Sequence, residues 1–365
     1  MEPKSLVEHL SKIKDPRRAG YAHRHDLVEI LVIAVCAMCS DVEGFEEMED
    51  WARAKEPWLR RFLKLEHGIA SHDTFRRVFA LLDPQAFEKA FRSWVASVLG
   101  AFGQVAIDGK ALRGSASADN GPLHMVSAFA TELGLVLGQE AVADKSNEIT
   151  AIPVLLEALD IKGCLVSIDA MGTQRHIAST IVSQGANYLL TVKNNQPTLR
   201  TALEDAFIDT PMHGYEQVQR EHGRIVLQHA QIIANTGQVD RALWPGCKSL
   251  GRVISLRDEG QKPQSLETRY YISSDQLSHQ AFLGAARNHW AIENKLHWSL
   301  DVTLAEDASK VHKDNAPRNL SLIRKIVLNL LRHDTAHPKA SLKRRRKMAG
   351  WDDDERMRLL GIEPL

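Results

Sequence analysis

One stretch of the sequence places an acid between two imidazoles and two indoles. Residues 286–307 read ARNHWAIENKLHWSLDVTLAED, and a His-Trp pair occurs in them twice. If the stretch is helical, His289, Glu293 and His297 lie four residues apart and share one face. Such a face is either a packing stripe or a metal site. Zinc hydrolases space their ligands more tightly, as in His-Glu-x-x-His, and that motif does not occur here. Packing of the histidines and tryptophans against neighbouring elements is therefore the simpler interpretation.

Two further acids each follow a short apolar segment of the strand type. Asp108 ends the segment VAID, and Asp169 ends the segment VSID. In α/β sheets, ligands gather outside the carboxyl ends of the strands. If the two strands are neighbours, Asp108 and Asp169 therefore project into one crevice. A single aspartate in this position is most simply a turn or cap residue, but two in matched positions favour a function.

The chemistry that fits such a pair is divalent-metal chemistry. Two close carboxylates repel each other and raise one pKa unless a cation lies between them. Mg²⁺ prefers carboxylate oxygens together with water and substrate phosphate. Two such ions, roughly 3.5–4 Å apart, can activate an attacking oxygen and stabilise a leaving one. A metal pair needs a third carboxylate, for which Glu293 is the natural donor. The sequence thus predicts two Mg²⁺ ions, replaceable by Mn²⁺, at Asp108, Asp169 and Glu293.

The elements that must position these acids have the pattern of an α/β sheet. From about residue 103 the segments read as three strands, a helix, a strand, a helix and a strand, with a polar loop GKALRGS directly after Asp108. The crossover helices make the later strands parallel, which predicts a mixed sheet with flanking helices. Residues 207–275 are β-rich and more polar, and we interpret them as an insertion that covers or flanks the site. Helical segments follow at 278–299 and 317–333.

Residues 1–100 have a helical pattern, with candidate helices at 26–39, 44–54, 57–65, 72–82 and 85–99. In the helix at 72–82, Arg76 and Arg77 point outward from an apolar stripe, which consists of Phe75, Val78, Phe79 and Leu82. With the glycine-containing turn before it, this basic helix has the pattern of a helix-turn-helix, and an ordinary helical bundle fits equally well.

Composition and charge bound the class of protein. A chain of 365 residues is long enough for two or three domains. The net charge is zero, but residues 310–347 hold twelve Lys or Arg against two Asp, including the run KRRRK. Such a patch is typical of nucleic-acid binding or of a solvated tail. The longest apolar run, at 27–38, is too short for a membrane span and contains Glu29. The four cysteines show no disulfide framework, and the N-terminus no secretory signal, so we expect a cytoplasmic protein.

Five segments together carry a family resemblance: AIDGKALRGS, DKSNEITAIPVLLEAL, VSIDAMGTQ, YLLTVKNNQ and RNHWAIENKLHWSLDVTLAED. In these the chain resembles the transposases of H-repeat (ISAs-type) bacterial insertion sequences, within the DDE class, whose catalytic core is ribonuclease H-like. By that resemblance Asp108, Asp169 and Glu293 match the DDE triad, and the β-rich insertion lies between the second Asp and the Glu.

The chain departs from the wider class around the glutamate. Many relatives carry a Tyr-x2-Arg-x3-Glu-x6-Lys signature, and the Tyr, Arg and Lys positions hold Ala286, His289 and Leu300 here. Only the Glu is retained. Three nearby acids therefore remain alternative third carboxylates, namely Asp301, Glu306 and Asp307.

The resemblance implies a DNA transposase that cleaves insertion-sequence ends and transfers the strands to target DNA. A nuclease of the same fold without strand transfer, or a non-catalytic DNA-binding derivative, is the alternative. We expect a DNA-end-binding domain at 1–100, a catalytic domain at 101–335 and a basic tail at 336–365. The partner is double-stranded DNA, bound by at least a homodimer. The candidate DNA contacts are Lys110, Arg113, Gln174, Lys193, Asn194, His289, His297, Arg76, Arg77, Lys343, Arg344, Arg345 and Arg346.

Overall fold

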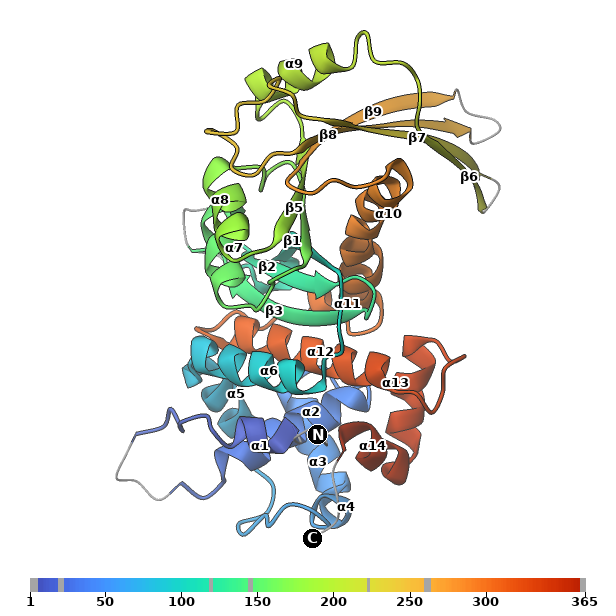
Figure 1. Cartoon of the computed structure of the whole chain (residues 1–365). Coiled ribbons are helices and arrows are strands. Elements are labelled where there is room, and N and C mark those ends of the chain that lie inside the picture. Colours follow the sequence, from blue (N-terminus) through green and yellow to red (C-terminus); the bar gives the residue numbers. More distant parts are fainter. Residues whose placement is uncertain are drawn as a thin grey trace.

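The strands that the structure describes form one nine-stranded sheet. A layer of helices lies at one end of this sheet, and a splayed group of its own strands forms the other end (Figure 1). The computed structural model describes residues 6–18, 23–117, 121–143, 147–221, 224–258 and 264–361. Residues 144–146, which open one of the five resemblance segments, lie outside these ranges. The strands run in the order β3-β2-β1-β4-β5-β9-β8-β7-β6. Their bounds are β1 Gln104–Leu112, β2 Leu123–Ala130, β3 Leu135–Ala141, β4 Leu165–Ile168, β5 Asn187–Val192, β6 Tyr215–Glu221, β7 Arg224–Ala234, β8 Ser249–Asp258 and β9 Ser265–Ser273.

The first five strands have the predicted order and the topology of a ribonuclease H-like core. β1 pairs antiparallel with β2 and parallel with β4, and β4 pairs parallel with β5. The crossovers carry the predicted helices α7 (Glu148–Glu157) and α8 (Arg175–Ser183). The prediction that β1 ends at Asp108 is wrong, because β1 continues to Leu112. Its extension pairs with β2 from Asp108, opposite Ser127, to Leu112, opposite Leu123.

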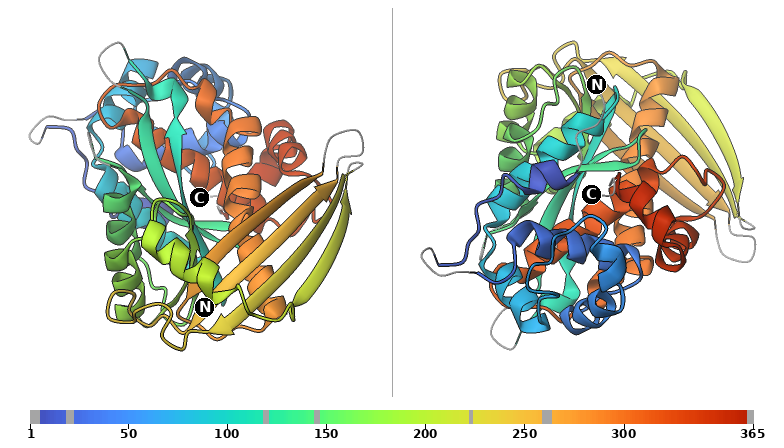
Figure 2. Two further views of the ribbon diagram at one scale, coloured as in Figure 1. Left: turned by 90° about the horizontal axis from the view of Figure 1, so that it is seen from above. Right: turned by 90° about the horizontal axis from the view of Figure 1, so that it is seen from below.

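The β-rich insertion is confirmed, and it extends the same sheet. β9 pairs antiparallel with β5, and β8, β7 and β6 follow outward (Figure 2). Helix α9 (Pro197–Ala206) leads into these strands. One face of the insertion packs against α10 (His279–His289), where Ala230, Val253 and Tyr271 meet the buried Phe282. This contact anchors the insertion beside the helix that precedes Glu293.

Gly251 in β8 is required by this contact, which gives a first testable prediction. A Cβ built on Gly251 would lie 2.5 Å from Cζ of the fully buried Phe282. We expect Gly251→Ala to lower the free energy of unfolding by about 1–3 kcal/mol, because the core has no room for another carbon. The free energy of unfolding is measured by urea denaturation. Gly284→Ala on α10 is the control, since nothing lies within 4 Å of its added Cβ. A Gly251→Ala protein as stable as the wild type would contradict the packing.

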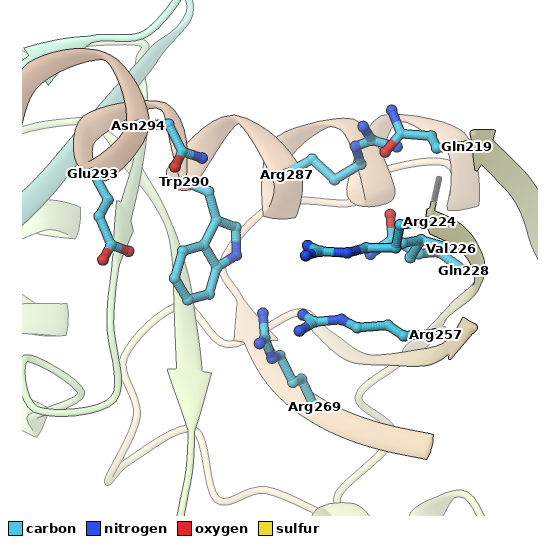
Figure 3. A pocket seen from close by; sticks show the side chains of 10 residues that line it. All are labelled: Gln219, Arg224, Val226, Gln228, Arg257, Arg269, Arg287, Trp290, Glu293 and Asn294. Carbon is cyan, nitrogen blue, oxygen red and sulfur yellow. The ribbon is translucent and has the colours of Figure 1, made fainter. Parts of the chain in front are cut away.

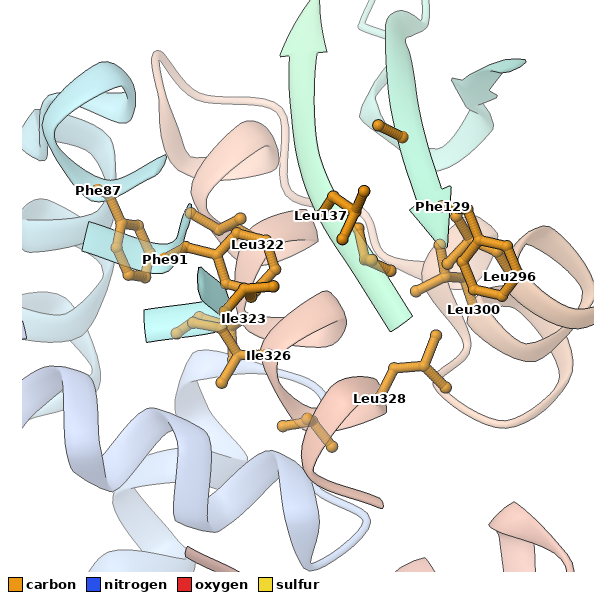
Figure 4. Packing of buried hydrophobic residues seen from close by; sticks show 14 of the residues in the cluster. Phe87, Phe91, Phe129, Leu137, Leu296, Leu300, Leu322, Ile323, Ile326 and Leu328 are labelled. Atoms are coloured by element: carbon orange, nitrogen blue, oxygen red, sulfur yellow. The ribbon is translucent and has the colours of Figure 1, made fainter. Parts of the chain in front are cut away.

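The helical layer shares one apolar core with the sheet. Helix α12 (Ala316–His333) lies between β3 and the N-terminal helices, and its buried residues belong to the same cluster as those of the sheet. In Figure 4, Phe87 and Phe91 pack beside Leu322 and Ile326 of this helix. The N-terminal helices are α1 Leu6–Leu10, α2 Leu27–Cys39, α3 Phe45–Ala54, α4 Glu56–Leu59, α5 His72–Leu81 and α6 Pro84–Val98. Packing is therefore continuous across residue 100.

The apolar stripe predicted for the helix at 72–82 is confirmed. The apolar stripe of α5 is fully buried, at Phe75, Val78, Phe79 and Leu82. All four cysteines are buried and free. No helix within the described ranges is both long enough and apolar enough to cross a membrane.

The basic C-terminal segment is folded, which differs from the predicted tail. Residues 342–351 and 353–360 form α13 (Leu342–Trp351) and α14 (Asp353–Leu360), and both contact α2. Arg346 is buried, where its Nε donates to the carbonyl oxygen of Met38 at 3.0 Å and its Nη1 pairs with Asp41 at 2.7 Å. The guanidinium of Arg356 is also buried, 4.0 Å from the centre of the Trp58 ring. These arginines join the C-terminal helices to the N-terminal layer.

Candidate active site

A cavity of about 240 Å³ brings the three predicted carboxylates together. It lies where the parallel strands β4 and β5 end, with β9 on one side and the segment after α10 on the other. Asp108 comes from β1, Asp169 follows β4, and Glu293 follows α10. The other residues that line it are Ala170, Thr191, Lys193, Arg269, Tyr271, His289, Trp290 and Ile292.

The register of β1 and β4 places the two aspartates side by side. Ile107 pairs with Ile168, so Asp108 and Asp169 are the next residues on two parallel neighbours. Asp169 also closes the turn after β4, because its Oδ1 accepts hydrogen bonds from the N–H groups of Met171 and Gly172 at 3.0 and 3.3 Å. The interpretation of Asp169 as a turn residue is therefore confirmed, and its position at the cavity is compatible with the predicted site role. One carboxylate oxygen fixes the turn, and the side chain still reaches the cavity.

Glu293 lies in a π-helical turn, which the sequence did not predict. Helix α10 ends at His289, a π-helix follows at Ile292–His297, and α11 begins at Trp298 (Trp298–Val302). The i→i+5 hydrogen bonds of a π-turn widen the helix, so the shared face expected from α-helical spacing is not kept. His289 Nδ1 lies 3.2 Å from Ser167 Oγ, whereas His297 Nδ1 lies 3.5 Å from Asp108 Oδ2. His289 thus contacts β4, which precedes Asp169, and His297 contacts Asp108 on β1.

Burial and mutual repulsion of the acids dominate the electrostatics around Asp108. Burial, and then the charge of Asp169, raise the pKa of Asp108 to about 7, with smaller contributions from Glu148 and Glu293. Burial lowers the pKa of His289 to about 4. Burial also lowers the pKa of His297 to about 4, helped by two nearby lysine charges. Both imidazoles are therefore neutral near pH 7 and cannot offset the negative charge.

Glu148 is a fourth acid at this site, and sequence reasoning missed it. It opens α7, and its carboxylate lies over the β1 backbone, because a Cβ built on Gly109 would lie 2.0 Å from Glu148 Oε1. Burial and the charge of Asp169 raise the pKa of Glu148. The available signal was Gly109 itself, since a glycine inside a strand often marks close approach by another group.

This donor set fits a hard divalent cation. In the part of the chain that the structure describes, no three His, Cys, Asp or Glu side chains are close enough to hold a metal ion by themselves. Mg²⁺ is usually bound through one or two carboxylates, with water and substrate phosphate completing its ligands. The convergence of Asp108, Asp169 and Glu293 on one cavity, and the raised pKa of Asp108, match that mode of binding.

The raised pKa gives a second prediction, on stability. Asp108 binds its proton more tightly in the folded protein, with a pKa of about 7, than at its ordinary value of 3.8. Folding stability is therefore lost as the pH rises from about 4 through about 7. In metal-free buffer at about pH 8, Asp108→Asn is expected to raise the free energy of unfolding by on the order of 1–3 kcal/mol. Thermal unfolding in EDTA measures this. The same variant at about pH 4 is the control, and an equal gain at both pH values would contradict the electrostatic cause.

Lys110 does not line the cavity, which differs from the expectation that it meets phosphate there. Its Nζ lies 2.7 Å from Asp301, 3.1 Å from Glu306 and 2.9 Å from Asp307, so three carboxylates neutralise it. These are the three acids that the sequence left as alternatives to Glu293. None of them lines the cavity. Arg113 is 83% exposed and lies 3.6 Å from Asp307 at the edge of this cluster.

The other candidate DNA contacts lie in separate parts of the fold and differ in their exposure. Lys193 lines the cavity, and Gln174 and Asn194 lie in the neighbouring loops after β4 and β5. Arg76 pairs with Asp73 at 2.9 Å, while Arg77 is exposed. On α13 the candidates Lys343 and Arg344 are exposed. Arg345 instead donates to backbone carbonyl groups, those of Leu331, Asp334 and Ala340.

Comparison with known proteins agrees with this geometry. A family model described as a transposase DDE domain matches residues 103–330, and a DDE_Tnp_1-associated model matches residues 7–95. The chain is 40% identical to the "H repeat-associated putative transposase YhhI" of Escherichia coli (strain K12), over 96% of both chains. It is also 40% identical to the "Putative transposase YncI" of Escherichia coli O157:H7, over 95% of this chain and 92% of that one.

A solved piggyBac transposase synaptic complex with hairpin DNA aligns with 97% of this chain and 79% of its own, at 11% identity and a TM-score of 0.47. A similarity of this degree assigns no role to any residue. The family model covers all the strands of the sheet and most of α12, and the relatives from Escherichia coli match nearly end to end. The chain belongs to the family of transposases that carry a DDE domain.

Proposed function

We propose that this chain cleaves DNA at the ends of a bacterial insertion sequence and joins those ends to target DNA. The observation that carries the proposal is the single cavity lined by Asp108, Asp169 and Glu293, three acids from three separate elements, in a chain of the DDE transposase family. Two Mg²⁺ ions held by these carboxylates would activate the attacking oxygen and stabilise the leaving oxygen of the phosphodiester.

The residues of the chain supply position and charge. Asp108 and Asp169 are held by the β1–β4 register, and Glu293 is held by the π-turn opposite them. His297 contacts Asp108 and His289 contacts Ser167 in β4, so both act as positioning residues. Lys193 is exposed and lines the cavity, so its ammonium group would bind the scissile phosphate. Hydrolysis of the strand leaves a 3′-hydroxyl. That hydroxyl then attacks a target phosphodiester and displaces the 3′-oxygen of the target strand, so one P–O bond forms as another breaks.

The helical layer would hold the duplex. Arg77 on α5 and Lys343 and Arg344 on α13 are exposed cations on helices that share its core. Such residues bind phosphates and fix the register of the protein on DNA without reading its sequence. We place the reaction in the bacterial cytoplasm. Because two ends must be cut in concert, we expect at least a dimer in the DNA complex.

The experiment that tests the proposal uses the DNA that flanks the gene for this chain. The purified protein is incubated with that DNA and Mg²⁺, and the products are resolved on denaturing gels. Cleavage at the ends together with joined products supports a transposase. Cleavage without joined products would favour a nuclease of the same fold. Metal-independent binding with no nicking would favour a non-catalytic DNA-binding protein, and either of these results would overturn the proposal.

A further inference from the structure

A second and larger cavity, of about 630 Å³, lies beside the catalytic one. The two share Arg269, Trp290 and Glu293 in their walls. Figure 3 shows Trp290 between Glu293 and a group of arginine side chains that point into the same space. The other residues that line this second cavity are Gln219, Arg224, Val226, Gln228, Arg257, Arg287 and Asn294. None of the arginines was a candidate in the sequence.

The strand register explains why the arginines gather. In β7, Arg224, Val226 and Gln228 alternate onto one face, and the pairing continues from Val226 to Arg257 in β8. In β9, Arg269 lies opposite Val253 of the same face. Toward one end this face is apolar and packs on α10. Toward the other end it passes the last turn of α10, and arginine replaces the apolar residues there.

The arginine cavity presents positive charge and an aromatic surface. Four guanidinium groups line it, and the acid among the lining residues is Glu293. Arg287 Nη1 donates to the side-chain oxygen of Gln217 at 2.9 Å, a neutral partner that leaves its charge in place. Arg257 and Arg269 both contact Glu267, at 3.7 and 2.8 Å, so one carboxylate serves two cations. Trp290 is 39% exposed, and the Arg269 guanidinium lies 4.7 Å from the centre of its ring. A phosphate near the arginines and a flat base near the indole would both find partners.

We propose that the arginine cavity binds an unpaired nucleotide of the DNA strand that enters the catalytic cavity, with its phosphate on the arginines and its base against Trp290. This inference rests on the proposed function. A volume of about 630 Å³ is that of a small-ligand pocket and suits a nucleotide, not a duplex. Inside a duplex both faces of a base are covered by its neighbours, whereas an unpaired base can turn a face to an aromatic side chain. The shared wall at Trp290 and Glu293 joins the nucleotide site directly to the scissile position.

The experiment compares binding to two DNAs in EDTA, where no cleavage occurs. One is a short blunt duplex, and the other is the same duplex with a single-stranded extension, both followed by fluorescence anisotropy. The wild type is expected to bind the extended duplex more tightly. Trp290→Ala is expected to lose about 5- to 100-fold in affinity for the extended duplex, with little change for the blunt one. Trp290→Phe keeps an aromatic face and is expected to retain most of the preference.

Matched controls come from the same chain. Trp298 belongs to the second His-Trp pair, is 58% exposed and lies outside both cavities, so Trp298→Ala is expected to bind like the wild type. Arg257→Gln is expected to lower the salt dependence of binding to the extended duplex by about 0.7 in the log–log slope. Arg220 follows Gln219 in β6 and points to the opposite face, so Arg220→Gln is not expected to change it. Equal thermal midpoints verify that each variant is folded.

Any of four results would overturn the inference. The first two are the absence of a preference for extended DNA in the wild type, and wild-type affinity for extended DNA in Trp290→Ala. The other two are an equal loss for blunt and extended DNA in Trp290→Ala, and the same loss in Trp298→Ala as in Trp290→Ala. These failures are distinct from failure of the proposed function. If the protein prefers extended DNA but shows no Mg²⁺-dependent cleavage, only the proposed function is contradicted. If it cleaves DNA but has no preference for extended DNA, only the nucleotide site is contradicted.

Discussion

Replacement of Asp108 by alanine is expected to abolish strand cleavage while DNA binding is kept. Asp108 is half-buried, and it is the proposed ligand whose pKa is raised by burial and by the charges of Asp169, Glu148 and Glu293. Without the Asp108 carboxylate, β1 offers no acidic metal ligand at the cavity. The neighbours of this position are Asp169 and His297. Since metal coordination supplies several kcal/mol to phosphoryl transfer, the rate is expected to fall by about 10³-fold or more.

The measurement is a nicking assay with Mg²⁺, run beside a gel-shift assay with the same DNA. Binding should be kept, because the proposed duplex contacts lie on the helical layer and not at Asp108. Asp209 is a suitable control, since it lies in the loop after α9 and lines neither cavity. Asp209→Ala is expected to cleave like the wild type. If Asp108→Ala still cleaves DNA, the proposal that Asp108 holds a metal ion needed for cleavage is wrong.

The second large effect separates Glu293 from the acids near it. Glu293→Gln is expected to lose cleavage by about 10³-fold, because the neutral amide binds Mg²⁺ far more weakly than a carboxylate. Glu293 is exposed, so the variant is expected to fold normally. Asp307→Asn, by contrast, removes one of three carboxylates around Lys110 and leaves the catalytic cavity intact. That protein is expected to be less stable but still active.

The same nicking assay and a thermal unfolding curve decide between the two acids. The predicted pattern is an inactive, stable Glu293→Gln protein and an active, less stable Asp307→Asn protein. The opposite pattern would mean that the third carboxylate comes from the Lys110 cluster.

Strands and helices with local patterns were predictable from the sequence. The apolar runs that end in Asp108 and Asp169 predicted β1 and β4, and the spacing of Phe75, Val78 and Phe79 predicted α5. The extension of β1 was missed because its residues, among them Gly109 and Lys110, favour a loop locally. They form a strand because β2 supplies hydrogen-bond partners along their whole length.

The parts of the site that depend on tertiary contacts were not predictable. Nothing in the local sequence signals the π-turn, which places Ile292 and Leu296 in the core and Glu293 at the cavity. The capture of Lys110 by three acids depends on how the segment after α11 folds back onto β1. The arginine cavity is formed from four strands and one helix that only the register brings together.

Arg346 is a case in which a signal existed and was outweighed. The run KRRRK reads as one solvated patch when only charge is counted. Helical spacing instead puts Arg346 on one face with Leu342 and Ala349, four residues after the first and three before the second. That face packs inward, and the buried guanidinium pairs with Asp41 and Glu43.

The most direct test of the central claim, that Glu293 completes a divalent-metal site with Asp108 and Asp169, is calorimetric titration of Mn²⁺ into the wild type and into Glu293→Gln. The wild type is expected to bind Mn²⁺ measurably, and Glu293→Gln is expected to lose about tenfold or more in Mn²⁺ affinity. Asp307→Asn in the same titration should bind Mn²⁺ like the wild type. Equal Mn²⁺ affinity in the wild type and Glu293→Gln would contradict the claim and leave Glu293 a structural acid.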